Sequence, residues 1–404
     1  MQIARLTPPS LRTAQEEGRR SATWLELFYD LAFVVAVAVL GVALVHDMSW
    51  GGIASFFGYF ALIWWLWVSH TFYADRFDTD DLVYRVLAAT QMVAIVVIAA
   101  ALSGDHSHSI TAFAVGYTIA RVSLLILYYR VHKHVAEVRD LVAGYLRGFG
   151  LGAVVWASSI FVDEPFVFTV WTVALAIDLA TPWVMRRLQA RVPLDISHLP
   201  ERFGLFTILV LGESITAVVT GLTHLEWAVV PTLTAALGIG IATCLWWMYF
   251  DNAEGSVVRR RDRGGGKTWR PTAWIYTHFP LAAALAAVGV SLETAVAEAG
   301  HGPMPAPERW IFVGSVAAAF AAMALIQEAS LSHPHLAINR AIAYNRLAAV
   351  PFLMVIGLMG QLEAQWVAVG VFGVCIAEVI GDLALAAHSR ELQRLDEEAT
   401  ANDE

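Results

Sequence analysis

Residues Leu205 to Gly221, LFTILVLGESITAVVTG, form an apolar run that is interrupted near its middle by Glu213. A helix of about 20 apolar residues crosses the hydrocarbon core of a bilayer, so this run covers most of one. A charged side chain at that depth costs roughly 2.5 to 3.5 kcal/mol and usually faces a bundle interior or a wet cavity. Other apolar runs carry ionizable residues in the same way: Glu26, Asp30, Arg121, Asp178, Arg346 and Glu378.

The composition places the whole chain of 404 residues in the membrane class. Hydrophobic residues make up 58% and charged residues 15%, and the mean hydropathy is +0.59. Soluble domains have more charge and fewer apolar residues. We therefore expect an all-α polytopic integral membrane protein with about twelve transmembrane helices. The expected spans are 24–45, 51–73, 83–102, 110–129, 145–162, 166–186, 203–223, 227–250, 273–293, 310–328, 341–359 and 364–386.

Basic residues on alternate loops predict the orientation, because cytoplasmic loops retain Lys and Arg. One side receives nearly all of them, whereas the other receives only Arg309. This asymmetry predicts an even number of spans in the inner membrane, with both termini cytoplasmic. Residues 1–23 are polar and lack the pattern of a cleaved signal peptide, so we expect the first span to be retained.

The two halves of the chain share features that indicate an internal repeat. Glu26-Leu27-Phe28 corresponds to Glu201-Arg202-Phe203, and Trp64 to Trp67 corresponds to Trp246 to Tyr249. Six spans separate the copies, so the repeats would be parallel. We predict a tail at 1–23, six-helix repeats at 24–190 and 191–388, and an acidic cytoplasmic tail at 389–404. Aromatic belts recur in any membrane protein, so the alternative is that these similarities arise without an internal repeat.

Five motifs carry a family resemblance from the first span to about the ninth. They are Glu26-Leu27-Phe28-Tyr29-Asp30-Leu31-Ala32-Phe33-Val34, Arg76-Phe77-Asp78-Thr79-Asp80-Asp81, His198 to Ile208, Leu211-Gly212-Glu213-Ser214 and Tyr276 to Leu281. The chain resembles the bacterial low temperature requirement A (LtrA) family. The resemblance implies a multi-span inner-membrane protein. It implies no particular reaction, because the family name records a growth phenotype.

A looser similarity concerns lysosomal and bacterial potassium channels whose six-span units open with Arg-x-x-x-Phe-Ser-Asp. Residues Glu26 to Val37 and Glu201 to Glu213 are similar to that opening. This chain departs from the motif, since Ala22 stands where Arg is expected and Phe28-Tyr29-Asp30 replaces Phe-Ser-Asp. The similarity implies two six-span units, and the departures leave the pore residues without a match.

Glu26 and Asp30 are four residues apart and therefore share one face of the first span. Two carboxylates that close do not both ionise freely in a low dielectric. One interpretation is a site for a proton or a small cation. The other is a structural ion pair with an arginine from another span, for which the candidates are Arg121, Arg147 and Arg346.

Glu213 lies between Gly212, which lets a neighbouring helix approach, and Ser214, whose hydroxyl is a potential donor to the carboxylate. Glu213 has two interpretations, a transport or ion-binding site and a structural anchor. The same two interpretations apply to Asp178. Arg202, near the membrane boundary, is expected to pair with Glu201 or with an acid from another segment.

Weak metal candidates are His70 and His278 at span ends, and Asp78 and Asp80 in the loop before the third span. Imidazole and carboxylate groups ligate metals. The alternatives are structural roles. The histidines would form hydrogen bonds within the packed interior, and Asp78 or Asp80 would cap the N-terminus of the third span. We predict no cofactor.

Within the spans, carboxylates outnumber arginines and lysine is absent, which favours a cationic species in any pathway. The leading hypothesis is permeation or transport of a small cation or proton through an acid-lined helical core, without enzyme activity. One alternative is an anionic small molecule held by Arg121 or Arg346, and another is a membrane enzyme or cofactor carrier using His70 and His278. We expect membrane lipids as partners and expect no nucleic acid. The sequence is also compatible with a homo-oligomer.

Overall fold

The computed structural model describes residues 7–11, 22–78, 80–103, 109–192, 198–223, 228–252, 270–330 and 336–402. Helices make up nearly all of this part of the chain. Two short strands, β1 (Ser10–Leu11) and β2 (Phe77–Asp78), pair antiparallel, with Ser10 opposite Asp78. They tie the N-terminal segment to the connection that follows the second helix.

The α-helices are listed here with their bounds: α1 Trp24–His46, α2 Trp50–Arg76, α3 Leu82–Ser103, α4 Ser109–His134, α5 Arg139–Ser158, α6 Phe166–Val184, α7 Arg186–Gln189, α8 His198–Leu222, α9 Val229–Asn252, α10 Arg270–Ala297, α11 Ala306–Ala329, α12 Leu336–Leu358 and α13 Ala364–Asn402. Short 3-10 helices at Ala136–Val138 and Ser159–Phe161 flank α5. Among the described residues, 12 helical segments are long and apolar enough to cross a membrane. The predicted all-α polytopic fold is confirmed.

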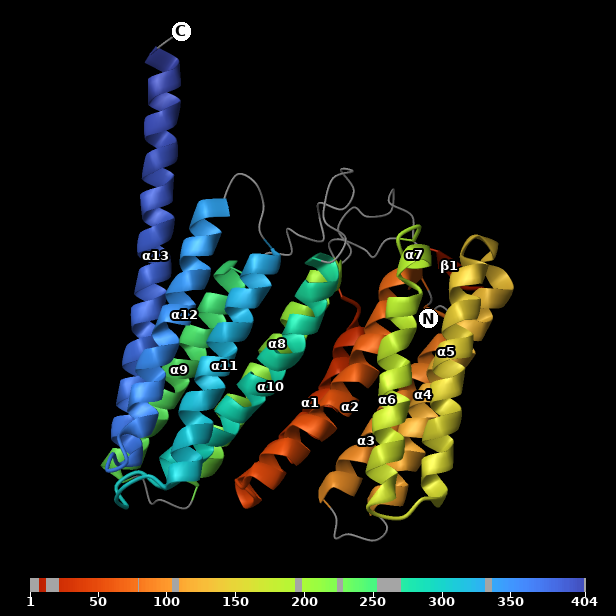
Figure 1. Cartoon of the computed structure of the whole chain (residues 1–404), viewed down its shortest axis with the longest axis horizontal. Helices are drawn as coiled ribbons and strands as arrows, with labels where there is room; N and C mark the ends of the chain where they lie inside the picture. The colour runs from red at the N-terminus through yellow and green to blue at the C-terminus, as the bar shows by residue number, and fades with distance from the viewer. Residues whose placement is uncertain are drawn as a thin grey trace. The chain divides into compact units, whose positions relative to one another are not determined.

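Several helices extend beyond the spans that hydropathy predicts. The fifth membrane segment starts at Ala136 rather than 145, and α8 starts at His198 rather than 203. The added turns contain polar residues, which a hydropathy window excludes even when a helix buries them. At the other end, α13 continues to Asn402 and extends well past α12 (Figure 1).

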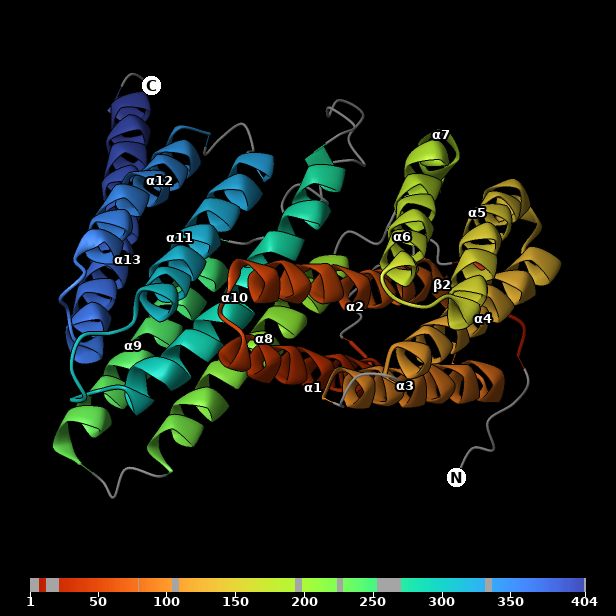
Figure 2. The ribbon, with the colours of Figure 1, turned by 60° about the horizontal axis from the view of Figure 1, so that its bottom comes forward.

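The chain divides into two compact units. Unit 1 contains residues 1–43 and 54–206, and unit 2 contains residues 44–53 and 207–404. In unit 1, α3, α4, α5 and α6 pack in chain order, each against the next (Figures 1 and 2). In unit 2, α10, α11, α12 and α13 pack in the same sequential way, and α9 lies against α13 and α10. The first turns of α8 belong to unit 1, which places His198 and Arg202 there.

The units bury charged side chains together with an apolar core, and they expose apolar side chains on the spans. Large apolar side chains on the spans are exposed, among them Phe166 at 71% and Phe352 at 66%. Fully buried side chains include three arginines, Arg121, Arg202 and Arg346. Lipid-facing apolar surfaces with charges turned inward are typical of membrane bundles.

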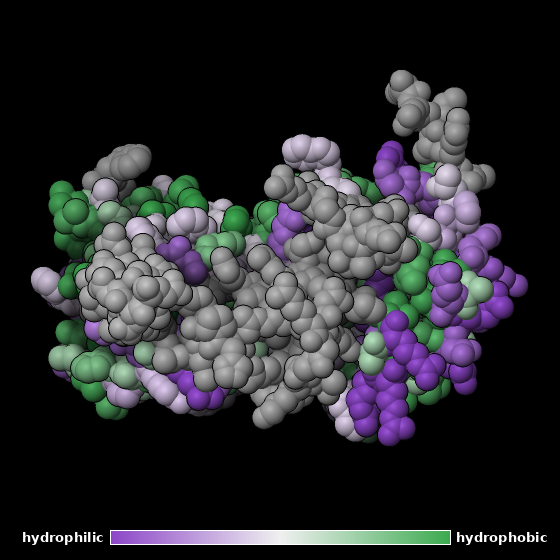
Figure 3. Space-filling view, turned by 90° about the horizontal axis from the view of Figure 1, so that it is seen from above, coloured by the Kyte–Doolittle hydropathy of each residue, from purple (hydrophilic) through white to green (hydrophobic). Residues whose placement is uncertain are grey.

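The helix ends contrast with the apolar spans. On the face seen in Figure 3, hydrophilic side chains gather over the end of unit 1 where α4 is followed by α5. Lys133, Arg139 and Asp140 are exposed in this region. Such an end is suited to contact with water and lipid headgroups.

Candidate functional site

The site begins at the first turn of α1, where local sequence fixes the position of Glu26. Thr23 precedes the helix, and its backbone N–H donates to Glu26 Oε2 at 2.7 Å. The Glu26 backbone N–H donates to Thr23 Oγ1 at 3.3 Å in return. This reciprocal pair is a capping box, which satisfies two helix N–H groups at once. The carboxylate of Glu26 is thereby held at the start of the membrane segment and is 3% exposed as a residue.

Arg202 of α8 bridges both acids of the first span. Its Nη2 lies 2.5 Å from Asp30 Oδ1, and its Nη1 lies 3.4 Å from Glu26 Oε1. Trp67 Nε1 of α2 donates to the same Asp30 oxygen at 2.7 Å. Of the two interpretations of these acids, the ion pair with an arginine from another span is present, but not with Arg121, Arg147 or Arg346. The expectation that Arg202 pairs with an acid from another segment is confirmed. The partner is Arg202, because α8 starts early enough to bring its first turns into unit 1.

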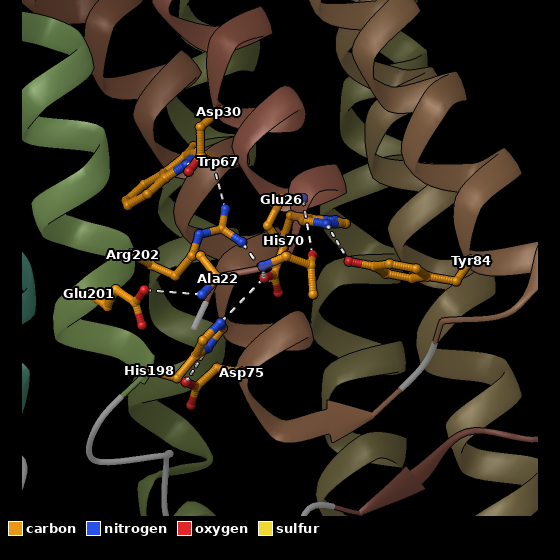
Figure 4. Close-up of polar contacts among 11 residues, drawn as sticks. Ala22, Glu26, Asp30, Trp67, His70, Asp75, Tyr84, His198, Glu201 and Arg202 are labelled. Atoms are coloured by element: carbon orange, nitrogen blue, oxygen red, sulfur yellow. Dashed lines mark hydrogen bonds and ion pairs between the residues drawn. The ribbon is translucent and has the colours of Figure 1, made fainter. Parts of the chain in front are cut away.

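His198 lies one helical turn before Arg202, on the same face of α8. Its Nε2 is 3.3 Å from Glu26 Oε2, and its Nδ1 is 3.3 Å from Asp75 Oδ1 near the end of α2. All three residues are buried. Figure 4 shows the resulting row of side chains, from Asp75 through His198, Glu26 and Arg202 to Asp30. We call these five residues the acid–histidine row.

Aromatic and amide groups adjoin this row. The ring of His70 stacks on Tyr29 with 4.0 Å between centroids, and the Tyr84 hydroxyl lies 3.3 Å from His70 Nε2. The Tyr29 hydroxyl donates to Gln91 Oε1 at 2.7 Å. The buried Asp30 Oδ2 has no hydrogen-bond partner among the described residues.

Arg121 and Asp178 form a separate buried pair in unit 1. Arg121 Nη2 lies 2.5 Å from Asp178 Oδ2, with both side chains at 0% exposure, and Nη1 donates to Ser69 Oγ at 3.1 Å. The guanidinium also lies 5.5 Å from the Tyr117 ring and 5.6 Å from the Phe149 ring. This arrangement joins α4 to α2 and α6 and stabilises the positive charge on several sides.

Unit 2 contains a related network centred on Arg346. This residue of α12 donates to Asp382 Oδ2 at 2.9 Å, Gln327 Oε1 at 2.9 Å and the Met248 carbonyl at 3.0 Å. Next to it, Asn345 donates to Glu378 Oε2 at 3.0 Å. Glu378 and Asp382 are four residues apart on α13, which is the same spacing as that of Glu26 and Asp30 on α1.

The remaining carboxylates in the predicted transport set lie apart from these pairs. Glu201 Oε1 accepts a bond from the Ala22 backbone N–H at 3.1 Å. Glu213 is partly exposed, and no hydrogen bond or ion pair to its carboxylate is found among the described residues. Ser214 is fully buried without a partner for its Oγ in that part of the chain, so the expected Ser214 bond to Glu213 is wrong. Consecutive helical residues point about 100° apart, which separates the two side chains.

The metal candidates are placed separately. Asp80 forms an exposed pair with Arg85 at 2.8 Å, and Asp78 lies in β2. The expected capping of the third span by Asp78 or Asp80 is wrong, because Asp81 Oδ1 accepts the Tyr84 N–H at 2.9 Å. Asp81 directly precedes α3 and occupies the N-cap position.

The two histidines named as weak metal candidates have packing partners. His278 Nε2 lies 3.1 Å from the Tyr249 hydroxyl, and its Nδ1 lies 2.7 Å from the Trp274 carbonyl. His70 has the aromatic neighbours described above. Among the residues that the structure describes, no three His, Cys, Asp or Glu side chains are grouped to hold a metal ion.

Several residues of these networks were not predicted as site residues. They are Trp67, Asp75, Gln91, His198, Gln327, Asn345 and Asp382. For His198 a signal was present, because it lies in the most specific family motif, four positions before Arg202. Trp67 had no comparable signal, since its partner Asp30 comes from another helix.

The fold and the buried charges define a class, the polytopic helical membrane proteins with an ionizable interior. Residues 21–380 match the family model for the bacterial low temperature requirement A protein (LtrA), and the chain belongs to this family. It is also 30% identical over 301 residues to the uncharacterized protein RA0937 of Rhizobium meliloti (strain 1021). The match covers 70% of each chain.

Proposed function

We propose that this integral membrane protein lets a small cation or proton cross the inner membrane, past the acid–histidine row of unit 1. The observation that carries the proposal is the row itself. It contains three buried carboxylates, Glu26, Asp30 and Asp75, against one arginine and one histidine. Ionizable residues are expensive in a membrane and commonly mark ion pathways or proton relays. An excess of carboxylates favours a cationic species.

The alternatives draw less support from the contacts of their residues. An anionic substrate would have to displace Asp178 from Arg121 or Asp382 from Arg346, and both arginines already have buried carboxylate partners. A metal or haem enzyme would need further ligands beside His70 or His278. The proposal therefore rests on transport, with the permeant in contact with carboxylates.

The experiment measures flux into liposomes that contain the purified full-length protein. Trapped dyes report protons, K⁺ and Na⁺ separately under an imposed gradient and membrane potential. The natural chain is expected to carry at least one of these ions faster than protein-free liposomes. Glu26→Gln combined with Asp30→Asn should reduce that flux to the protein-free level.

A matched control is Asp80→Asn, which removes an exposed ion pair in which both side chains are more than half exposed. This variant should transport as the natural chain does. If liposomes with the natural chain carry none of the three ions, the proposed function is wrong. If the double variant keeps full flux, the row is structural only.

A further inference from the structure

We propose that the permeant is the proton, and that His198 passes it between Asp75 and Glu26. This inference rests on the proposed function and specifies its substrate. The geometry that carries it is the position of one imidazole between two carboxylates from different helices. Each ring nitrogen of His198 is 3.3 Å from a carboxylate oxygen, Nδ1 from Asp75 and Nε2 from Glu26.

Four carboxylate oxygens of the row already contact nitrogen atoms of the protein, namely Glu26 Oε1 and Oε2, Asp30 Oδ1 and Asp75 Oδ1. His198 and the Thr23 backbone N–H approach Glu26 Oε2, and Arg202 approaches Glu26 Oε1. Arg202 and Trp67 share Asp30 Oδ1. A metal cation requires several oxygen ligands directed at one point. Here it would have to displace a guanidinium that stays protonated and repels it. A proton requires only a hydrogen-bonded donor and acceptor.

The transfer step is balanced in bonds and charge. Neutral His198 starts with its proton on Nε2, and Asp75 carries the incoming proton. The Asp75 O–H bond breaks as an Nδ1–H bond forms, and the Nε2–H bond breaks as a Glu26 O–H bond forms. His198 ends as the other neutral tautomer, Asp75 becomes a carboxylate, and Glu26 carries the proton. The two distinct ring nitrogens of histidine make such a relay available.

Arg202 holds the receiving acid without carrying the proton itself, because arginine does not deprotonate in proteins. It is therefore a positioning residue that orients Glu26 and Asp30. Near it, the buried Asp30 Oδ2 has no hydrogen-bond partner in the described part of the chain.

The competing explanation is a static clamp, in which a protonated His198 holds two carboxylates together. His198→Lys separates the two ideas, since lysine keeps a positive charge but lacks a second ring nitrogen. Asp75→Asn keeps a hydrogen-bonding side chain of the same shape but has no carboxyl proton to exchange. The two remaining charged members of the row, Asp30 and Arg202, are unchanged in both variants.

The test compares proton, K⁺ and Na⁺ fluxes in the same liposomes. We expect the natural chain to carry protons without either metal ion, and both variants to lose proton flux while Asp80→Asn keeps it. If His198→Lys or Asp75→Asn conducts protons at the natural rate, the relay is overturned and the proposed function survives. If the natural chain carries K⁺ or Na⁺ but no protons, the inference is overturned and the proposed function again survives.

One further outcome and one further measurement complete the test. Absence of flux for all three ions with the natural chain overturns both the inference and the proposed function. The selectivity measurement needs no variant, so a substitution that fails to insert does not prevent a decision. Measuring the flux of the natural chain in D₂O adds an independent criterion. A relay limited by proton transfer is slower in D₂O, whereas K⁺ permeation does not depend on a transferred hydrogen.

Discussion

Arg202 and Asp30 are 172 positions apart in the sequence, yet Arg202 Nη2 lies 2.5 Å from Asp30 Oδ1 with both side chains fully buried. The contact ties the first turns of α8 to α1. A charge buried in this way is stable only with its partner, since its desolvation is otherwise uncompensated. The pair therefore has a structural consequence as well as any role in transport.

We predict that Arg202→Gln lowers the stability of the protein strongly. The substitution leaves Asp30 and Glu26 without their shared cation, and breaking a buried pair typically costs about 3 to 5 kcal/mol. Thermal unfolding of the detergent-purified protein measures the effect as a lowered Tm. The control is Arg85→Gln, which removes an exposed pair of a kind worth about 0 to 1 kcal/mol. Equal Tm values for the two variants would contradict the prediction.

A second prediction concerns two glycines of α5. A Cβ at position 152 would lie 2.5 Å from Asp178 Oδ1, whereas a Cβ at position 150 would meet nothing within 4 Å. Asp178 cannot move away freely because Arg121 holds its other oxygen. Gly152→Ala should therefore lower the Tm by displacing this carboxylate from Arg121.

The matched control for that prediction is Gly150→Ala in the same helix. Alanine is favoured over glycine in a helix interior by up to about 1 kcal/mol, so this variant should be neutral or slightly stabilised. If Gly150→Ala had a lower Tm than Gly152→Ala, the prediction would be wrong, and the Arg121–Asp178 pair would tolerate displacement of the carboxylate.

The spans were predictable because hydropathy and length alone identify a membrane helix. Leu205 to Gly221 needs no knowledge of its neighbours to be assigned. The partners of the buried charges were not predictable in this way, since Arg202 finds Asp30 only after both helices have packed. Polar residues such as His198 and Arg202 end an apolar window, although α8 already includes both residues and buries them.

The two units share one structural relationship that the predicted repeat would produce. Arg121 joins α2 to α6 through Ser69 and Asp178, and Arg346 joins α9 to α13 through Met248 and Asp382. The paired helices are the second and the last spans of each half. The arginines differ in origin, because α4 is the fourth span of its half and α12 is the fifth.

A third prediction tests the parallel arrangement of the halves through topology. Reporter fusions after Asp47 and Gly302 should lie outside, and fusions after Lys133 and Arg394 should lie in the cytoplasm, because basic loops stay there. Alkaline phosphatase and a fluorescent protein give opposite signals for the two sides. A reversed pattern in the second half only would replace the parallel repeat by an inverted one.

The fourth prediction concerns Glu213, whose carboxylate lacks a hydrogen bond or ion pair among the described residues. Neutralising a carboxylate of this kind removes a desolvation cost, so Glu213→Gln should keep or raise the Tm. Asp178→Asn is the contrasting variant, since it leaves the buried Arg121 without its counter-charge and should lower the Tm. Comparing both variants by thermal unfolding and by liposome flux separates a structural role from transport.

A drop in Tm for Glu213→Gln would reveal a pairing, while unchanged Tm with lost flux would place Glu213 on the ion pathway. Unchanged Tm and unchanged flux together would remove Glu213 from the transport proposal and leave the acid–histidine row to account for it.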